Sequence, residues 1–291
     1  MNVLDIDTFW SSVAESRLIE TSRLEQLRRS SKTQDTVAVA KWLVSQGVLS
    51  TWQARRLVRG DRGPFFVGNF RLMKRLDAEG SGLLFRVREE GTGKWFQLRP
   101  LEGTLCKNQE IWSGIVRQTK IAKAVQSPLL SKTFTVSNVR SQRFIVCEDI
   151  PLTTLAEELS LHGKFTPESC LKVALEVTKG VAEIHRHGGV HGAISLHALR
   201  QASQEDGAAS REAGIRLAQF PLAGDPHLQP PRLPLEQKEQ IDALGHRACF
   251  LAPELTDSSS CCTPQSDVYA IGCLVHSLIL GSAIGWRGSP R

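Results

Sequence analysis

The sequence has little tyrosine and methionine, one and two residues among 291, and it lacks zinc-ligand patterns. None of its seven Cys forms a C-x-x-C pair or stands at a zinc-ligand spacing from a His, so we expect no metal site. Cys261 and Cys262 are adjacent and the others are scattered, which is typical of reduced thiols in a cytosol. The first residues include Asp5 and Asp7 instead of a basic segment, which predicts no signal peptide and a cytoplasmic location.

Clusters of Lys and Arg are missing as well. The net charge is +6, but the basic residues are spread along the chain without interleaved aromatics. That pattern favours a solvated surface over a nucleic-acid groove, so we expect no nucleic-acid partner. With 41% hydrophobic and 23% charged residues, the composition is typical of a globular protein. The length suits one large domain or two unequal ones.

Residues 1–62 contain an internal repeat with an offset of 30 residues: the apolar positions of residues 13–27 align with those of residues 43–57. Each copy predicts a helix, a break containing Ser or Gly, and a second helix that begins at Thr21 or Thr51. Apolar spacings of three and four residues give each helix one buried stripe. We therefore predict a small all-α unit of two helical hairpins. A scaffold or docking module is favoured over a DNA-binding helix-turn-helix, because the unit is only slightly basic.

The next segment predicts β-structure. Residues 61–64, Asp-Arg-Gly-Pro, form a cluster of turn residues that indicates a linker. Alternating apolar residues then predict strands at 65–76, 83–88 and 95–101. Residues 79–82, Glu-Gly-Ser-Gly, indicate a hairpin turn between the first two strands.

The C-terminal half is mainly helical by its apolar spacing. Thr166-Pro167-Glu168 is a strong helix start, with Pro in the first turn. The run from Val268 to Trp286 has no Asp, Glu, Lys or Arg and is long enough to span a membrane. His276 and several Gly interrupt it, so a buried core helix is favoured over a membrane tail anchor at 268–286.

The loop from His191 to Ala198, His-Gly-Ala-Ile-Ser-Leu-His-Ala, resembles the catalytic loop H-R-D-x-x-x-x-N of the eukaryotic-type (Hanks-type) Ser/Thr protein kinases, as found in bacteria. Ala193 stands at the position of the catalytic Asp, and Ala198 at that of the metal-binding Asn. A methyl group can neither accept a proton nor coordinate Mg²⁺, so the resemblance implies a degenerate catalytic site. His191 is retained as a structural residue.

The predicted hairpin turn resembles the glycine-rich loop of the family, whose backbone N–H groups close over the phosphates of ATP. Of its three glycines only Gly82 is in place. Asp77 and Glu79 occupy the other two positions, where their carboxylates would repel phosphate. The resemblance therefore implies at most weak nucleotide binding at Gly82.

A basic residue on the third strand continues the resemblance. Arg99 follows Phe85 by fourteen residues, the interval that leads to the family's third-strand Lys. It keeps the positive charge but not the geometry of Lys at a phosphate. The acidic partner of that Lys falls here on Gln118, which is neutral. The ion pair that marks an active kinase thus lacks both members.

Further landmarks follow in the family's order. The segment ending at Glu148 and Ile150 resembles the hinge strand, where backbone groups meet the adenine, so these two are weak nucleotide-binding candidates. Gln219 replaces the Asp of the D-F-G turn that holds Mg²⁺. Glu254 ends a segment that resembles A-P-E. Asp267 matches the residue that braces the backbone of the catalytic loop in the family, here below His191.

The resemblance implies an α+β fold, a two-lobed protein-kinase-like fold that is C-terminally shortened and follows the small all-α unit. We expect a helical-hairpin unit at 1–62, a small lobe with an antiparallel sheet at 65–150, and a mainly helical large lobe at 151–291. In the family three more helices would cover the last apolar helix. Its uncovered side is expected to expose apolar residues, namely Ile271, Leu274, Val275, Leu278 and Ile279.

The function implied is that of a pseudokinase, a signalling scaffold or binding module with little or no phosphotransfer. The alternative is a weak or atypical Ser/Thr protein kinase, for which His191, His197 and Ser195 are the available bases. No cofactor is required for the first function, although ATP or adenosine could bind without Mg²⁺. A protein partner is expected at the large lobe or at the helical unit.

Overall fold

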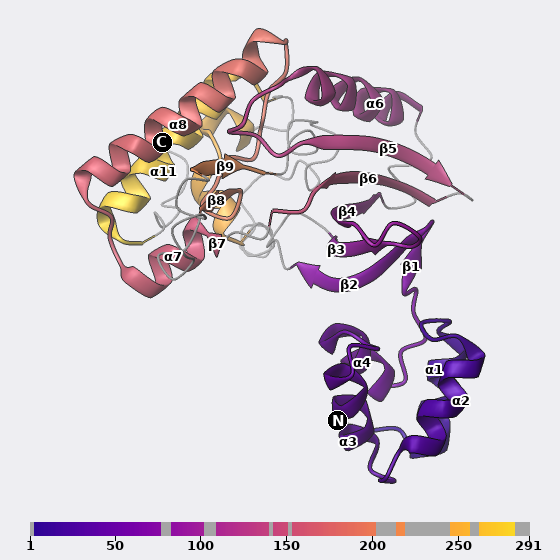
Figure 1. Ribbon diagram of the computed structural model, residues 1–291. Coiled ribbons are helices and arrows are strands. Elements are labelled where there is room, and N and C mark those ends of the chain that lie inside the picture. The colour runs from indigo at the N-terminus through magenta and orange to yellow at the C-terminus, as the bar shows by residue number, and fades with distance from the viewer. Residues whose placement is uncertain are drawn as a thin grey trace. The chain divides into compact units, whose positions relative to one another are not determined.

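A computed structural model of the chain divides it into two units, each with a hydrophobic core of its own (Figure 1). The first unit comprises Met1–Asp77, Leu83–Pro100 and Asn138–Gln142, and the second comprises the rest of the chain. The structure describes residues 3–76, 83–101, 109–139, 142–150, 153–201, 214–218, 245–256 and 262–282.

Four helices begin the first unit, and their first residues recur at the offset of the sequence repeat. They are α1 (Ile6–Glu15), α2 (Thr21–Ser30), α3 (Thr36–Ser45) and α4 (Thr51–Val58). Asp5 and Asp35 cap α1 and α3 by accepting hydrogen bonds from backbone N–H groups of the first turn. Ser50 and Gln53 form a capping box at α4. The apolar stripes meet in one core, whose fully buried members include Phe9, Leu43 and Leu57.

Alternating apolar residues form the strands of the first unit. These strands are β1 (Phe66–Val67), β2 (Phe70–Leu76), β3 (Leu84–Glu89) and β4 (Trp95–Leu101). Each pairs with the next in antiparallel register, so that Phe70 lies opposite Glu89 and Phe85 lies opposite Leu98. The three strands predicted from the sequence are therefore present, with a short turn that separates β1 from β2.

Gln53 connects α4 to β2. Its side chain is fully buried: Nε2 donates to the carbonyl oxygen of Leu72 at 2.7 Å, and Oε1 accepts from the backbone N–H of Ser50 at 2.9 Å. From β2, Arg71 donates through Nη2 to the carbonyl oxygen of Val48 at 2.8 Å. These bonds satisfy buried polar groups on both sides of the contact, so the helices and the strands are bonded together as one unit.

Aromatic rings extend this contact. The ring of Trp52 meets those of Phe65 and Phe85 edge-on, with ring centroids 6.1 Å and 5.6 Å apart. The helical repeat therefore shares its unit with β1–β4, whereas the sequence placed a domain boundary at residues 61–64. Residues 61–64 are turn residues, as the sequence indicates. The sequence pattern at a turn does not show that side chains before and after the turn, such as Trp52 and Phe65, pack against each other.

The remaining elements lie in the second unit, except for Asn138–Gln142, which belongs to the first. They are α6 (Gln109–Ala124), β5 (Thr133–Val139), β6 (Gln142–Glu148), β7 (Thr153–Thr154), α7 (Leu155–His162), α8 (Pro167–Arg186), β8 (Leu199–Gln201), β9 (Ile215–Leu217), the 3₁₀ helices η1 (Gly245–Phe250) and η2 (Pro253–Thr256), and α11 (Pro264–Leu280). Thr166 caps α8 and Pro167 occupies its first turn, as the sequence predicts. Strands β7, β8 and β9 form a three-stranded antiparallel sheet in which Leu199 lies opposite Leu217.

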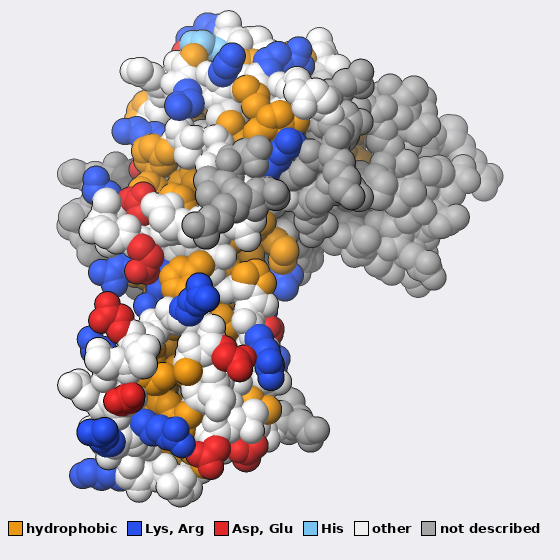
Figure 2. All heavy atoms as spheres, turned by 90° about the vertical axis from the view of Figure 1, so that its right-hand side faces the viewer, with side chains coloured by type: hydrophobic (Ala, Val, Ile, Leu, Met, Phe, Trp, Pro, Cys, Tyr) orange, Lys and Arg blue, Asp and Glu red, His pale blue; other side chains and the backbone are white. Residues whose placement is uncertain are grey.

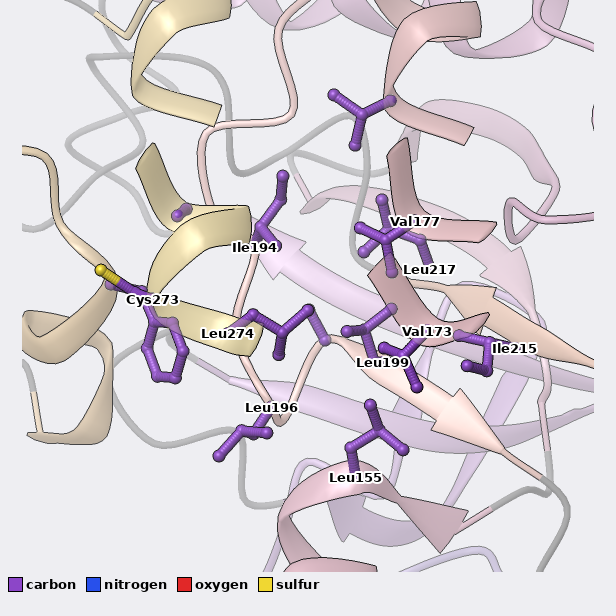
Figure 3. Packing of buried hydrophobic residues seen from close by; sticks show 14 of the residues in the cluster. Leu155, Val173, Val177, Ile194, Leu196, Leu199, Ile215, Leu217, Cys273 and Leu274 are labelled. Atoms are coloured by element: carbon purple, nitrogen blue, oxygen red, sulfur yellow. The ribbon is translucent and has the colours of Figure 1, made fainter. Parts of the chain in front are cut away.

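The core of the second unit lies where α8 and α11 pack against each other (Figure 3). Val173 and Val177 of α8 meet Leu274 of α11 in this cluster. The loop after α8 contributes Ile194 and Leu196 to the same cluster, and both are at most 4% exposed. Burial of these apolar side chains therefore stabilises the position of the segment that resembles a catalytic loop. This stabilisation does not require catalytic side chains in the loop.

The expectation about α11 was wrong for Leu274 and Leu278 and right for Ile279, which is 52% exposed. Leu274 and Leu278 are fully buried, and Ile271 packs against the core, because α8 and η1 contact the face on which they lie. The large exposed apolar side chains of this helix are Val268, Tyr269, Ile279 and Leu280. Nowhere in the part of the chain that the structure describes is a helix long and apolar enough to cross a membrane.

Candidate functional site

Asp267, in the first turn of α11, binds the backbone of the loop that follows α8. Its Oδ2 accepts a hydrogen bond from the backbone N–H of His191 at 2.8 Å, and its Oδ1 accepts one from Gly192 at 2.7 Å. Oδ2 also lies 2.8 Å from Nε2 of His185. The Asp267 residue is only 1% exposed, so these partners compensate a buried charge. Gly192 has a φ of 70°, which favours glycine and turns both N–H groups toward one carboxylate.

His191 is fully buried, and both of its ring nitrogens are engaged. Nε2 lies 3.0 Å from the carbonyl oxygen of Ala218, and Nδ1 lies 3.3 Å from the backbone nitrogen of Ala193. A carbonyl only accepts and an N–H only donates, so Nε2 carries the proton and Nδ1 is the acceptor. A second proton on Nδ1 would break the bond from Ala193. His191 is therefore suited to holding the loop and poorly suited to acting as a base.

Ala193 and Ala198 occupy the two positions where the chemistry of the loop would reside. They are 8% and 0% exposed. The backbone of Ala198 is fully used: its N–H donates to the carbonyl oxygen of Ser195 at 3.0 Å, and its carbonyl accepts from the N–H of Ala218 at 2.8 Å. The frame of the loop is thus complete. The side chains at both positions are methyl groups that can neither move a proton nor bind a metal.

The other two base candidates differ in access. Ser195 is 4% exposed and is buried with the loop. His197 is half-buried and lines a cavity of about 390 Å³ together with Glu157, Ser160 and Phe250. His197 is the one of the three candidates that lines this cavity. Among the described residues, no group of His, Cys, Asp or Glu is arranged to hold a metal ion.

Glu148, at the end of β6, is anchored by two segments. Arg216 of β9 donates to it in a bidentate pair, Nη1 to Oε1 at 2.9 Å and Nη2 to Oε2 at 2.7 Å. Oε2 also accepts the backbone N–H of Lys132 at 3.0 Å, and the N–H of Glu148 donates to the carbonyl of Lys132 at 2.8 Å. Burial by itself raises the pKa of Glu148, but the hydrogen bonds and charge of Arg216 and the Lys132 N–H outweigh it, so the pKa lies below its ordinary value.

The other predicted site residues lie on several different elements. Arg99 lies half-buried on β4 of the first unit, and Gln118 lies on α6 of the second, where its Oε1 is buried without a hydrogen-bond partner. Ile150 is buried just after β6, and Glu254 is exposed in η2. Gly82 and Gln219, with Asp77 and Glu79, lie outside the described residues.

Sequence reasoning missed His185 and Arg216. His185 meets Asp267 across 82 residues, and Arg216 meets Glu148 across 68. No spacing along the chain pairs such distant residues. The sequence shows only that His185 and Arg216 are basic. Many Arg and His residues on protein surfaces are basic too, so residue type by itself does not identify these two.

The protein kinase domain family matches residues 78–289 of this chain. Among curated proteins, the probable serine/threonine-protein kinase pknA2 of Bifidobacterium longum is 21% identical over 220 residues, which is 74% of this chain and 27% of that protein. The probable serine/threonine-protein kinase PknB of Lactococcus lactis is 20% identical over 220 residues, 75% of this chain and 32% of that protein. The chain therefore spans roughly a quarter to a third of the length of these relatives.

Solved structures give the same match at the level of fold. The kinase domain of Mycobacterium tuberculosis PknI superposes with a TM-score of 0.55 at 16% identity, covering 77% of this chain and 80% of that domain. A second crystal structure of the same domain gives a TM-score of 0.56 at 14% identity, covering 78% and 81%. The fold is accordingly the α+β protein-kinase-like fold, with an antiparallel sheet and a mainly helical part.

Proposed function

We propose that this chain, which belongs to the protein kinase family, acts as a pseudokinase: a binding or scaffold protein in signalling with little or no phosphotransfer. One observation supports this most directly. The loop frame is complete, from Asp267 to His191 and Ala218, while Ala193 and Ala198 are buried at the two positions that need a base and a metal ligand. A loop that is held in place but has no catalytic side chains can still form part of a binding surface for a partner.

Phosphoryl transfer depends on positioned charge more than on covalent chemistry by the protein. Metal ions must bridge the phosphates, and a carboxylate must receive the proton of the attacking hydroxyl. Ala193 and Ala198 can do neither. His191 cannot replace the base without losing the hydrogen bond from the Ala193 N–H, and Ser195 is buried. We accordingly propose that no cofactor is required and that, if a nucleotide is held, it is held through main-chain groups without Mg²⁺.

The partner and the location are part of the same proposal. We propose a protein partner at the helical unit or at the helical lobe and no nucleic-acid partner. A cytoplasmic location is supported by the scattered cysteines.

A second candidate function is that of a weak or atypical Ser/Thr kinase. Its specific support is His197, which lies in the loop, is half-buried, and lines the 390 Å³ cavity. An imidazole in that place could receive a proton from a substrate hydroxyl. This alternative needs a source of charge stabilisation for the phosphates, for which Arg99 is the candidate.

A phosphotransfer assay with radiolabelled ATP distinguishes the two functions. The purified chain is incubated with casein and either Mg²⁺ or Mn²⁺, next to Arg99→Ala and His197→Ala variants. The pseudokinase proposal predicts that wild type incorporates no more label than either variant. Incorporation that is abolished in both variants would establish the weak kinase. A thermal shift with adenosine that equals or exceeds the shift with Mg·ATP is the second expected result.

A further inference from the structure

The first unit contains a groove that the proposed function does not use. It has a volume of about 750 Å³ and runs between α4, β2 and the neighbouring strands β3 and β4. That volume is in the range of pockets that hold small ligands or a few residues of a peptide. All of its lining residues belong to the first unit, whereas the loop held by Asp267 belongs to the second.

Basic side chains dominate the lining. Six of its eleven residues are cations, and none of the described residues that line it is acidic. The cations are Arg55, Arg56, Arg59, Lys74, Arg75 and Arg86. Asp61, outside the lining, pairs with Arg56 at 2.6 Å.

Outside the groove, the helical part of the first unit carries both acidic and basic side chains. On the face in Figure 2, Lys and Arg side chains alternate with Asp and Glu over this part of the molecule. Two ion pairs there join Arg28 to Asp7 at 2.7 Å and Arg62 to Glu15 at 3.4 Å. A concave site without any acid is thus a local feature and does not simply follow from the net charge of the chain.

Two of the cations are placed directly opposite each other. Lys74 of β2 and Arg86 of β3 are partners in the antiparallel register, next to an irregularity between Leu72 and Lys74. Like charges in directly opposed positions destabilise a strand pair. Both side chains add positive charge to the lining of the groove.

Aromatic rings hold two of the guanidinium groups in place. The guanidinium carbon of Arg86 lies 4.5 Å from the ring centroid of Trp95, and that of Arg56 lies 4.8 Å from the ring centroid of Trp52. The Arg56 guanidinium already donates through Nε to Asp61 at 2.6 Å and through Nη2 to the carbonyl oxygen of Gly63 at 3.1 Å. The two Trp residues thus orient cations within the groove.

The shape and the ring contacts select among anionic partners. A bilayer presents a broad surface and cannot enter a concave groove of this size. Proteins bind single-stranded nucleic acid by stacking its bases on aromatic side chains. Here Arg56 and Arg86 already lie over the Trp rings. A short extended peptide with successive carboxylates fits the volume of the groove and the charge of its exposed cations Arg55, Arg59 and Lys74. We propose that this groove binds an acidic segment, rich in Asp and Glu, of a partner protein.

Binding of a fluorescein-labelled decapeptide of Glu to the full chain tests this proposal at near-physiological salt. The groove variant is Arg59→Glu with Lys74→Glu, both positions with solvent-accessible side chains. The matched control is Arg29→Glu with Lys41→Glu, at exposed positions, which changes the net charge equally. Arg29 is the counterpart of Arg59 in the thirty-residue repeat, so the two double variants disturb similar helix ends.

The groove variant should weaken binding by about tenfold or more, and the control by less than about twofold, because contacts inside a groove are screened less than diffuse surface charge. A milder variant, Lys74→Gln with Arg75→Gln, should give an intermediate loss and guards against misfolding by charge reversal. Equal weakening by the groove and control variants would overturn the proposal. So would tighter binding of a thymidine decanucleotide, or of phosphatidylserine vesicles, than of the peptide. The result does not depend on whether the chain transfers phosphate, so it is separable from the assay of the proposed function.

Discussion

The backbone nitrogen of His191 lies 2.8 Å from Oδ2 of Asp267, although 76 residues separate the two along the chain. The same carboxylate holds Gly192 and meets His185, so one side chain of α11 determines where the loop after α8 can lie. A charge-assisted bond to a backbone N–H is among the stronger hydrogen bonds in proteins. These bonds to the backbone of the loop do not involve the side chains of Ala193 and Ala198.

Replacing Asp267 should destabilise the whole second unit. Asp267→Ala removes the acceptor of two buried N–H groups and leaves them unpaired, so we expect a loss of about 3 kcal/mol or more in the free energy of unfolding. Asp267→Asn should cost less, since one acceptor remains. Urea denaturation followed by circular dichroism measures both. The control is Glu168→Gln at an exposed position of α8, expected within about 1 kcal/mol of wild type. An Asp267→Ala variant as stable as this control would contradict the interpretation.

Restoring the family's residues should not restore activity. Ala198 is fully buried among apolar residues, so Ala198→Asn must place an amide in a filled core and should cost about 2–3 kcal/mol. Ala193→Asp alone should leave phosphotransfer at the wild-type level, because no metal ligand accompanies the new carboxylate. Thermal unfolding checks the first statement and the radiolabel assay the second. Label above background in Ala193→Asp would show that a metal can still be bound.

Glu148 should make stability depend on pH. The pKa of Glu148 is lower in the folded state than the ordinary 4.5, so its contribution is present above that value and is lost as the pH falls through the folded pKa. Glu148→Gln should be destabilised by about 1.5–3 kcal/mol near neutral pH, the usual range for hydrogen bonds to a charged group. The difference from wild type should shrink once the pH falls below 4.5. Urea midpoints of both proteins across this range test the effect, and a constant difference would argue against it.

Gln53 should couple the helical repeat to the strands. Gln53→Leu keeps a similar side-chain volume but removes the hydrogen bonds to Leu72 and Ser50. We therefore expect the free energy of unfolding to fall by about 2–3 kcal/mol. Limited proteolysis should then cut between the helices and β1 faster than in wild type. Arg23, the exposed counterpart of Gln53 in the first copy of the repeat, provides the control as Arg23→Leu. If both variants are cut at the same rate, Gln53 does not join the two parts.

The exposed face of α11 should promote self-association. Val268, Tyr269, Ile279 and Leu280 are 63%, 44%, 52% and 57% exposed, and apolar side chains on one helix favour a covered state. We expect light scattering to show association at tens of micromolar, reduced by Ile279→Gln with Leu280→Gln. Val3→Gln, at another exposed apolar position, should change nothing. A wild-type chain that stays monomeric would mean that this face needs no partner.

Local patterns in the sequence were sufficient to predict the main secondary-structure elements. The thirty-residue repeat predicted two hairpins, alternating residues predicted the strands of the sheet, and Thr166-Pro167 marked the start of α8. These features depend on residues within one or two turns of each other. The loss of chemistry at Ala193 and Ala198 also follows from residue identity alone, because a methyl group has no donor or acceptor in any fold.

Contacts between distant segments were decided only by the tertiary structure. The bidentate pair of Arg216 with Glu148, the burial of Gln53 against β2, and the basic groove each bring together residues that are not neighbours in the sequence. The same is true of Leu274 and Leu278, whose burial depends on which elements pack on α11. The helical and strand periods in a sequence show which face of an element is apolar. Which other element covers that face depends on contacts between segments far apart in the chain, and no local pattern encodes these contacts.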